Sequence, residues 1–298
     1  MCLQSLTEPR PSGSGCRELT PPNLLSTPVA EAKLAVAIAC GKLVNAFPPA
    51  AAAMKRTGIV ILSIAMAGVA QQAPVVKPVL VELFTSEGCS SCPPADALLA
   101  RLDQFQPVSG VEIVALEEHV DYWNHDGWTD PFSSAQFSRR QERYGEQFGI
   151  SDVYTPQMVV DGFRQLNGSD SRGAVSAIGA AARAEKLAVR ILRSAGGVRV
   201  EVDSGSHGGD VFLAVAQKAA SSQVLRGENQ GRSLRHVAIV RSLSQIGSVK
   251  SRAGFAKDVP LTSGEFEYRA IAFVQDSGPG RVRGAALLNV ATAAAGNH

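Results

Sequence analysis

The sequence carries little net charge, few cysteines and no apolar run long enough to predict a membrane span. Its 29 Lys and Arg residues nearly balance 27 Asp and Glu residues, which leaves a formal net charge of +2. Proteins that bind nucleic acid gather basic side chains on one face, whereas the arginines of segment 139–146 are interleaved with glutamates. We therefore expect no nucleic-acid partner and interpret that segment as a solvated helix face.

Three of the five cysteines lie before a second methionine, Met54. Two basic residues, an apolar run and several small residues follow Met54 in that order. This order is typical of a secretory signal, and its apolar core is too short to span a bilayer comfortably. We expect a signal peptide at 54–73 and interpret 1–53 as a non-native or disordered extension upstream of the true start. The alternative is a two-part targeting region that uses an apolar helix over 34–47.

Removal of such a signal leaves one cysteine pair, Cys89 and Cys92, in an oxidising compartment. We therefore expect a periplasmic or secreted protein with no stable membrane span after cleavage. Two thiolates and scattered histidines disfavour a zinc site. A c-type haem is excluded because Pro93, and not His, follows Cys92.

The cysteine pair lies where a predicted strand meets a predicted helix. The apolar run 79–85 predicts a buried strand. Pro93 and Pro94 predict the first turn of a helix, where the missing proline N–H is not needed. At that place the helix dipole and unpaired N–H groups favour a thiolate, and two intervening residues can bring the Cα atoms within about 4.4–6.8 Å, as a disulfide requires.

The pattern of apolar and turn residues changes at about residue 188. Before it we expect helices over 94–105 and 134–148, a strand over 111–116 parallel to 79–85, a hairpin that pairs 157–160 with 163–166, and a last helix from 169 or 170. After it, the expected β-type runs are 189–192, 198–202, 211–216, 236–240, 266–273 and 282–290. The sequence thus predicts an α/β domain over 75–188 followed by a smaller all-β, sandwich-like domain over 189–298.

Two motifs within 75–188 resemble the thioredoxin-like superfamily. One is Cys-x-x-Cys after the first strand, and the other is the segment 155–162, Thr-Pro-Gln-Met-Val-Val-Asp-Gly. The second is similar to the place where thioredoxins carry a cis-proline before an antiparallel strand and hairpin. The resemblance implies a thioredoxin-like fold for this part of the chain.

A closer resemblance is to an exported family of unknown function found in bacteria and plants, with a CxxCPP motif. The segments that carry it are 82–96, 121–128 and 153–162, and it extends through 227–232 toward the C-terminus. This resemblance brings no substrate with it. The chain also departs from the thioredoxin pattern, because Ser-Ser replaces Gly-Pro between the cysteines and Gly88 replaces an aromatic residue. The redox potential therefore does not carry over.

The thioredoxin resemblance implies roles for five residues. Cys89, the more exposed sulfur at the corner, would be the attacking thiolate, and Cys92 would resolve the mixed disulfide. Pro156, if cis, would lie opposite the pair and present the backbone of Thr155 to an incoming peptide. Glu82 is a candidate proton shuttle, with a paired carboxylate as the alternative.

The loop 119–131 should overhang the pair, because both leave the sheet at the carboxyl ends of strands. Trp123 and Trp128 are candidates for an apolar wall that contacts substrate, and the alternative is that they pack the loop onto the domain. We interpret the metal-ligand residue types of this loop as solvated: His119, Asp121, His125, Asp126 and Asp130. A polar group in the second half is interpreted as a turn and an inter-domain contact: Glu228, Asn229, Arg232 and His236.

These motifs predict an exported thiol–disulfide oxidoreductase with no dissociable cofactor. Its expected partners are exported protein thiols or disulfides, or small thiols, and a redox partner protein. One alternative is a copper(I)-binding protein in which Met158 adds a third ligand to the thiolates. The other is a non-catalytic binding module in which the pair is a permanent staple.

Overall fold

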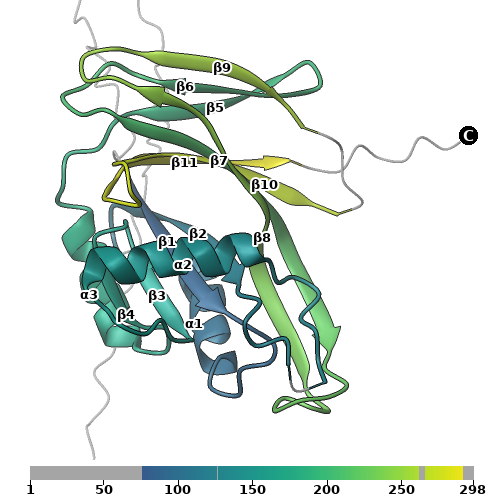
Figure 1. The fold of residues 1–298 in the computed structure, drawn as a ribbon. Coiled ribbons are helices and arrows are strands. Elements are labelled where there is room, and N and C mark those ends of the chain that lie inside the picture. Colours follow the sequence, from purple (N-terminus) through teal and green to yellow (C-terminus); the bar gives the residue numbers. More distant parts are fainter. Residues whose placement is uncertain (1–75, 126, 262–265, 291–298) are drawn as a thin grey trace, which may run out of the picture. The chain divides into compact units, whose positions relative to one another are not determined.

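Eleven strands and three helices form the part of the chain that the structure, a computed structural model, describes: residues 76–125, 127–261 and 266–290 (Figure 1). The first seven elements are β1 (Lys77–Thr85), α1 (Pro93–Phe105), β2 (Val111–His119), α2 (Ala135–Phe148), β3 (Gln157–Val160), β4 (Arg164–Asn167) and α3 (Ser171–Ala181). The remaining seven are β5 (Val189–Ser194), β6 (Gly197–Val202), β7 (Gly209–Gln223), β8 (Ser233–Val249), β9 (Phe255–Pro260), β10 (Tyr268–Gln275) and β11 (Val282–Val290). The predicted signal peptide and extension, 1–73, lie outside the described residues.

Local signals account for the helix ends. Cys92 is the N-cap residue of α1 and two prolines follow it in the first turn, as the sequence predicts. At the start of α2, the Ser134 hydroxyl accepts a hydrogen bond from the Gln136 N–H. Gly149 ends α2 in the left-handed region, with φ of 65°, which costs glycine little.

Eight strands form one mixed sheet in the order β11-β10-β7-β8-β2-β1-β3-β4. The predicted parallel pairing of the first two strands is confirmed, with β1 and β2 in register from Lys77 opposite Val111 to Thr85 opposite His119. The predicted hairpin is also confirmed, since β3 and β4 pair antiparallel around a turn at Asp161 and Gly162, although the second strand is Arg164–Asn167, one residue later than predicted. β8 lies parallel to β2, with Glu117 opposite Ile239.

The predicted fold class, an α/β thioredoxin-like domain followed by a smaller all-β sandwich-like domain, is wrong. Strands from both sides of residue 188 join in the one sheet, and the described chain is mostly strand. The second half extends the sheet through two long strands, β7 of 15 residues and β8 of 17 residues. Helices therefore cover only part of a sheet that is larger than either predicted domain would contain.

The length of β8 escapes sequence analysis for a physical reason. Its second half has apolar residues at every third position, Leu243, Ile246 and Val249, and not at the alternate positions of a half-buried strand. The pairing of β7 with β8 shifts register twice. A β-bulge adds one residue to one strand of a pair, so these shifts return the apolar side chains to the buried face.

Three layers of side chains bury the two faces of the sheet. On one face, Phe137 of α2 packs with Leu80 of β1 and Ile271 of β10. On the other, α1 and α3 cover β1, β2 and β3. The separate three-stranded sheet β5-β6-β9 covers β7 and β10. Figure 1 shows α2 lying across the strands and the small sheet at the far end.

Charged side chains also enter the buried face beneath α2. Arg140 lies 2.5 Å from Glu82 and 3.6 Å from Glu118. The Tyr144 hydroxyl donates to Glu82 at 2.6 Å, and Gln275 of β10 bonds both Arg140 and Tyr144. Burial raises the pKa of Glu118 well above its ordinary value, despite the opposing charge of Arg140. This network joins strands from the two halves of the chain.

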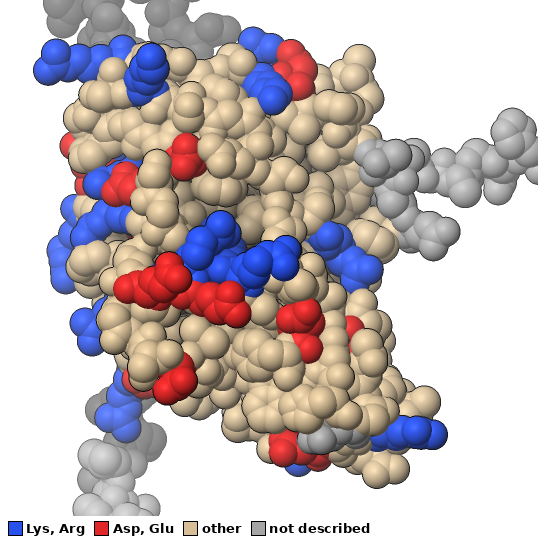
Figure 2. Space-filling model, viewed as in Figure 1, with Lys and Arg blue, Asp and Glu red and all other residues tan. Residues whose placement is uncertain are grey.

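The surface that carries α2 shows basic and acidic side chains next to one another (Figure 2). None of the helices in the described ranges has the length and hydropathy that a membrane crossing requires.

Substitution of Arg140 by Ala tests the network beneath α2. Loss of the cation leaves the Glu82 carboxylate buried without its partner, which costs about 3–5 kcal/mol of unfolding free energy. Urea denaturation of the full chain measures this cost. Arg139 is exposed on the same helix, so Arg139→Ala is the matched control and should change the free energy by less than about 0.5 kcal/mol. Equal losses in the two variants would contradict the account.

Candidate functional site

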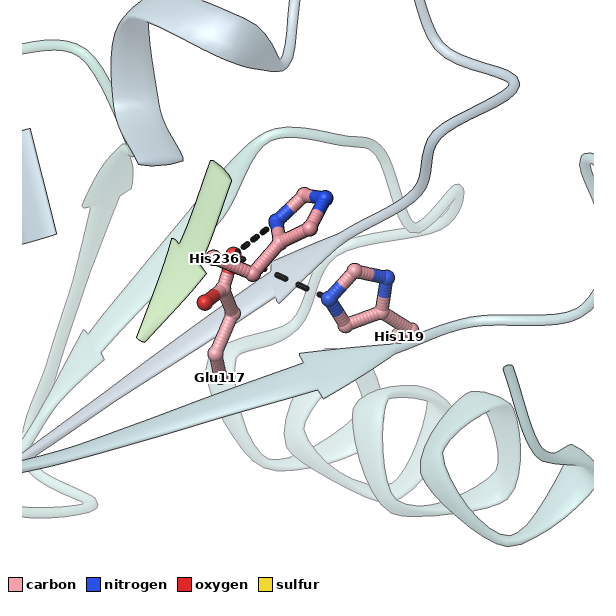
Figure 3. A group of neighbouring side chains, drawn as sticks. All are labelled: Glu117, His119 and His236. Atoms are coloured by element: carbon pink, nitrogen blue, oxygen red, sulfur yellow. Dashed lines mark hydrogen bonds and ion pairs between the residues drawn. The ribbon is translucent and has the colours of Figure 1, made fainter. Parts of the chain in front are cut away.

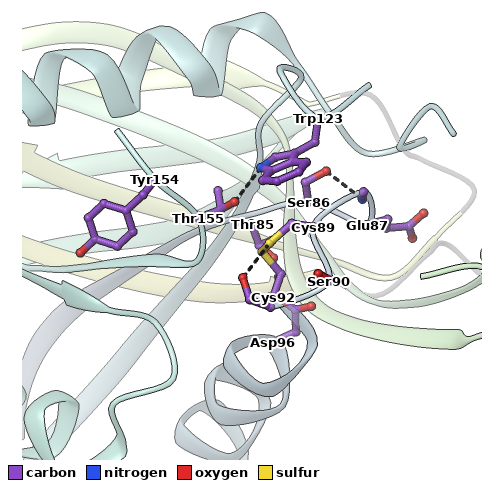
Figure 4. Close-up of a disulfide and its surroundings, with 12 residues drawn as sticks. Thr85, Ser86, Glu87, Cys89, Ser90, Cys92, Asp96, Trp123, Tyr154 and Thr155 are labelled. Atoms are coloured by element: carbon purple, nitrogen blue, oxygen red, sulfur yellow. Dashed lines mark hydrogen bonds between the residues drawn. A yellow bond between two sulfur atoms is a disulfide. The ribbon is translucent and has the colours of Figure 1, made fainter. Parts of the chain in front are cut away.

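A disulfide joins Cys89 and Cys92 at the N-terminus of α1, with their Cα atoms 5.5 Å apart (Figure 4). The Cys89 N–H donates to the Ser86 carbonyl, and the Cys92 N–H donates to the Cys89 carbonyl, both at 3.2 Å. These two turns lead the chain from β1 into the first turn of α1. The pair therefore lies at the predicted strand-to-helix corner.

The two cysteines hardly differ in exposure in the disulfide-bonded state, although Cys89 is expected to be the more exposed sulfur. Cys89 is 1% exposed and Cys92 is 0% exposed, although Ser90 and Ser91 between them are exposed. The corner itself is thus at the surface, while the sulfur-bearing residues are covered.

Two segments from distant parts of the chain cover the cysteine corner. Trp123, in the loop between β2 and α2, packs against Gly88, where a Cβ atom would lie 2.8 Å from the Trp123 carbonyl oxygen. Asn229, at the tip of the β7–β8 hairpin, donates to the carbonyls of Glu87 and Cys89, each at 2.9 Å. The hairpin tip is therefore hydrogen-bonded to the backbone on both sides of Gly88.

The predicted substrate-binding residues contact each other. The indole N–H of Trp123 donates to the Thr155 hydroxyl at 2.7 Å, and Figure 4 shows both beside the disulfide. The Thr155–Pro156 peptide bond is cis. A Cβ atom on Gly168 would lie within 3.0 Å of side-chain atoms of both Pro156 and Ala95, so the start of β3 lies against the first turn of α1. The functional roles of these residues stay predictions.

Glu82 lies away from the cysteines, because side chains alternate between the faces of a strand. Its carboxylate points toward Arg140 of α2, whereas the cysteine pair begins α1 on the other face. The alternative interpretation, a paired carboxylate, describes its surroundings. The buried acid one helical turn after Cys92 is Asp96, which the sequence motifs do not single out.

Asp96 follows Cys92 by one helical turn and is 5% exposed. Thr85 of β1 donates its hydroxyl to the Asp96 carboxylate at 2.6 Å. Burial and the charge of Glu117 raise the pKa of Asp96 to about 7. Its i, i+4 spacing from Cys92 is the sequence signal that could have identified it, since such positions share one helix face.

Two histidines and several carboxylates meet on the same face of the sheet as Asp96. Glu117 and His119 are two residues apart on β2, and His236 comes from β8 (Figure 3). All three are no more than 1% exposed. The Glu117 Oε1 atom lies 2.8 Å from His236 Nδ1 and 3.7 Å from His119 Nε2. Each residue offers a ligand atom within 4.8 Å of the others, so the group could hold a metal ion.

Further carboxylates hold the outer sides of both rings. Asp130 lies 2.7 Å from His119 Nδ1 and accepts the backbone N–H groups of Glu87 and Phe132. The Glu87 side chain lies 3.3 Å from His236 Nε2 and accepts from the Trp128 indole at 3.0 Å. Trp128 therefore packs the loop through a polar contact.

The charges of these neighbours control the titration of both rings. Burial opposes a positive charge on His119. The negative charge of Asp130 and its hydrogen bond with the ring outweigh burial and raise the pKa of His119 to about 9. For His236 burial also opposes charge, but the hydrogen bond and charge of Glu117 raise the pKa to about 11. Burial disfavours the Glu117 carboxylate, yet its close contacts with His119 and His236 and their positive charges keep its pKa below the ordinary value.

The interpretation of the loop residues as solvated is wrong for His119 and Asp130, which are 0% and 2% exposed. It holds for His125, which is exposed, and Asp126 lies outside the described residues. Asp121 accepts a hydrogen bond from Ser138. No spacing rule joins His119 to His236, because a long-range strand pairing brings them together.

The remaining predicted residues lie in the apolar core, at the hairpin tip or on β8. Met158 is buried in the apolar core with Leu83 and Ala95. The turn interpretation is confirmed for Glu228, Asn229 and Arg232 at the hairpin tip, where Arg232 bonds Asn229. It is wrong for His236, which lies buried on β8. Glu228 there accepts the Ser90 N–H at 3.0 Å.

Residues 80–275 match DUF1223, a family described as proteins of unknown function. The chain belongs to the DUF1223 family. The resemblance to a family of unknown function is thereby confirmed, and the matched range of the DUF1223 chain includes the cysteine pair, Asp96 and the histidine cluster.

One solved structure is similar to this DUF1223 chain over most of its length. It is the X-ray crystal structure of protein AGR_C_4864 from Agrobacterium tumefaciens, with 26% identity and a TM-score of 0.64 over 76% of this chain and 100% of that one. The sporulation control protein Spo0M from Bacillus subtilis matches at 11% identity with a TM-score of 0.21, over 35% of this chain and 47% of that one, and this likeness carries no argument. No curated protein matches the chain.

Substitution of Asn229 by Ala tests the cover over the cysteines. Two buried carbonyls lose their donor, which costs about 1–3 kcal/mol, so we expect reduction of the disulfide by a phosphine to become about tenfold faster. Alkylation followed by mass spectrometry of the peptide that carries both cysteines measures the rate. Gln230 is exposed beside it, and Gln230→Ala should leave the rate unchanged. An Asn229→Ala rate equal to that of the wild type would show that the tip does not limit access.

Proposed function

We propose that the protein is an exported thiol–disulfide oxidoreductase that uses the Cys89–Cys92 pair. The observation that carries the proposal is a disulfide at a helix N-terminus with a buried carboxyl group, Asp96, one turn further along. The dipole of α1 favours a thiolate at its N-terminus. The N–H groups there add no free donor, because Pro93 and Pro94 have none and those of Ala95 and Asp96 donate to the Cys92 carbonyl. Asp96 provides a group that can give a proton to the leaving sulfur.

The proposed reaction begins when a substrate thiolate attacks Cys89 Sγ. A mixed disulfide forms at Cys89, the bond to Cys92 breaks, and the Cys92 thiolate takes a proton from Asp96. The second thiol of the substrate, as thiolate, then displaces Cys89 from the mixed disulfide. Two electrons pass from the substrate dithiol to the enzyme disulfide, and the reverse sequence reduces a substrate disulfide. A redox partner protein returns the pair to its starting state.

Access to Cys89 requires movement of its cover. Because Cys89 is 1% exposed, an attacking thiol reaches it only when the Trp123 loop or the hairpin tip moves. The contacts to be broken are the Trp123–Thr155 hydrogen bond and the two bonds of Asn229. The resemblance of segment 155–162 to the thioredoxin-like superfamily supports Thr155 and Trp123 as residues that contact substrate after this movement.

A second function is favoured by the same burial. Cysteines that are 1% and 0% exposed suit a permanent staple in a non-catalytic binding module. Structural disulfides resist reduction by cellular thiols, whereas a working pair must exchange. The two functions therefore differ in the reactivity of the pair in the folded protein.

Single cysteine variants test the order of the two sulfurs. We expect reduced Cys92→Ser, incubated with a disulfide-containing peptide, to accumulate a mixed disulfide at Cys89, because no second sulfur remains to resolve it. Cys89→Ser should not accumulate the adduct. Mass spectrometry of the intact protein detects the adduct, and the double serine variant is the control. Absence of the adduct from folded, reduced Cys92→Ser would favour the staple.

Asp96→Asn tests the proton donor. In the wild type, a small thiol opens the disulfide, and the rate constant is calculated per concentration of its thiolate form. This rate constant should fall as the pH rises past about 7, because Asp96 loses its proton. The groups that face this carboxyl are Thr85 of β1, Glu117 and His119 of β2, and His236 of β8.

In Asp96→Asn we expect opening to be at least about tenfold slower at pH 6, with no such fall. The free energy of unfolding, measured alongside, separates this effect from loss of structure. A folded Asn variant with the pH profile of the wild type would remove Asp96 from the reaction.

A further inference from the structure

The cluster of Glu117, His119 and His236 has a feature that its hydrogen bonds leave unexplained. His119 Nε2 is buried and has no hydrogen-bond partner, and it faces the Glu117 carboxylate at 3.7 Å (Figure 3). A buried polar atom without a partner is costly, and native proteins rarely keep one. A lone pair on this nitrogen would point into the space between the three side chains.

The spacing of the cluster is close to that of a bound metal ion. Zinc binds nitrogen and carboxylate oxygen at about 2.0–2.2 Å, so neighbouring ligand atoms of a tetrahedral site lie about 3.4 Å apart. Glu117 Oε1 is 3.7 Å from His119 Nε2 and 2.8 Å from His236 Nδ1. Small movements of two side chains would bring both distances to the required value.

A carboxylate lies beside the outer nitrogen of each ring, as beside many metal-binding histidines. Asp130 holds His119 through Nδ1 at 2.7 Å, which leaves Nε2 for an ion. Glu87 lies 3.3 Å from His236 Nε2 as an ion-pair neighbour without a hydrogen bond. An ion at His236 Nδ1 would replace the proton that this nitrogen shares with Glu117. Carboxylates in this outer position fix the tautomer and the orientation of the ring. Both are themselves held, Asp130 by backbone N–H groups and Glu87 by Trp128.

The donor set selects the class of ion. Two imidazole nitrogens and one carboxylate suit zinc and its neighbours among the divalent transition metals. Calcium and magnesium prefer sites made entirely of oxygen, and copper(I) prefers soft sulfur ligands. The excess of carboxylates around the two rings also favours a cation.

We propose that Glu117, His119 and His236 form a binding site for a divalent transition metal of the zinc type. This site is separate from the cysteine chemistry and does not rest on the proposed thiol exchange. The ion would join β2 to β8 at the point where the two halves of the chain meet in one sheet. A solvent molecule would complete a four-coordinate site.

Metal titration of the full chain, with all cysteines replaced by serine, tests this proposal without interference from thiolates. We expect the chelator-treated protein to bind one equivalent of zinc, measured by equilibrium dialysis and elemental analysis. Cobalt in place of zinc should give the visible absorption of a four-coordinate site. This spectrum needs no change to the site itself, so it tests the proposal even where a histidine substitution prevents folding.

Variants then locate the ion. We expect His119→Gln to weaken zinc binding at least about a hundredfold, and Asp130→Asn to weaken it about tenfold as a loss of ring orientation. His207 lies outside the cluster on the loop before β7, and His207→Gln should bind like the parent. Substoichiometric zinc in the folded parent, or binding unchanged in His119→Gln, would overturn the proposal and leave an ion-paired network only. Thiol exchange by the wild type is measured separately, so either idea can fail alone.

Discussion

The buried carboxylate of Glu117 bonds the first half of the chain to the second at the centre of the large sheet. Its oxygens accept from the His236 ring at 2.8 Å and from the Val237 N–H at 2.7 Å, where β2 and β8 lie side by side in parallel. A buried charge is tolerated only when such partners compensate its desolvation. This contact fixes β8 beside β2, and β8 in turn carries the hairpin whose tip covers the cysteines. The position of that cover therefore depends on a polar contact at the centre of the sheet.

Strand alternation separates the buried charges into two groups with different surroundings. Glu82 and Glu118 face α2, where Arg140 compensates them. Glu117 and His119 face α1, where Asp96 and His236 lie. A shift of one residue in β2 would move Glu118 to the face of α1 and move Glu117 and His119 to the face of α2. The register of the strands therefore determines which titratable side chains lie on the same face of the sheet as the cysteines.

The sequence predicts well what depends on neighbouring residues. The prolines after Cys92 locate the start of α1, and Asp161-Gly162 locates the β3–β4 hairpin. It predicts poorly what depends on distant pairing. The bulged second half of β8 lacks strand alternation, so the long hairpin does not follow from local pattern. His236 lies in the predicted β run 236–240, but no local pattern predicts that this run pairs with β2. The resemblance predicts Cys89 to be the more exposed sulfur, whereas the covering residue Asn229 lies 140 positions away.

The cysteine corner and the histidine cluster share a neighbour in Glu87. Its side chain lies against His236, and its carbonyl accepts from Asn229 beside Cys89. Contacts that share a residue couple energetically. A change in the packing of the histidine cluster should therefore change how tightly the hairpin tip covers the disulfide. The proposed function requires the covered Cys89–Cys92 pair to undergo thiol–disulfide exchange in the folded protein.

The reduction potential of Cys89–Cys92 in the folded protein tests that requirement most directly. Equilibration with glutathione or dithiothreitol buffers, followed by alkylation and mass spectrometry, measures it. The account predicts a potential above about −300 mV, and a value well below this would identify the pair as a structural bridge.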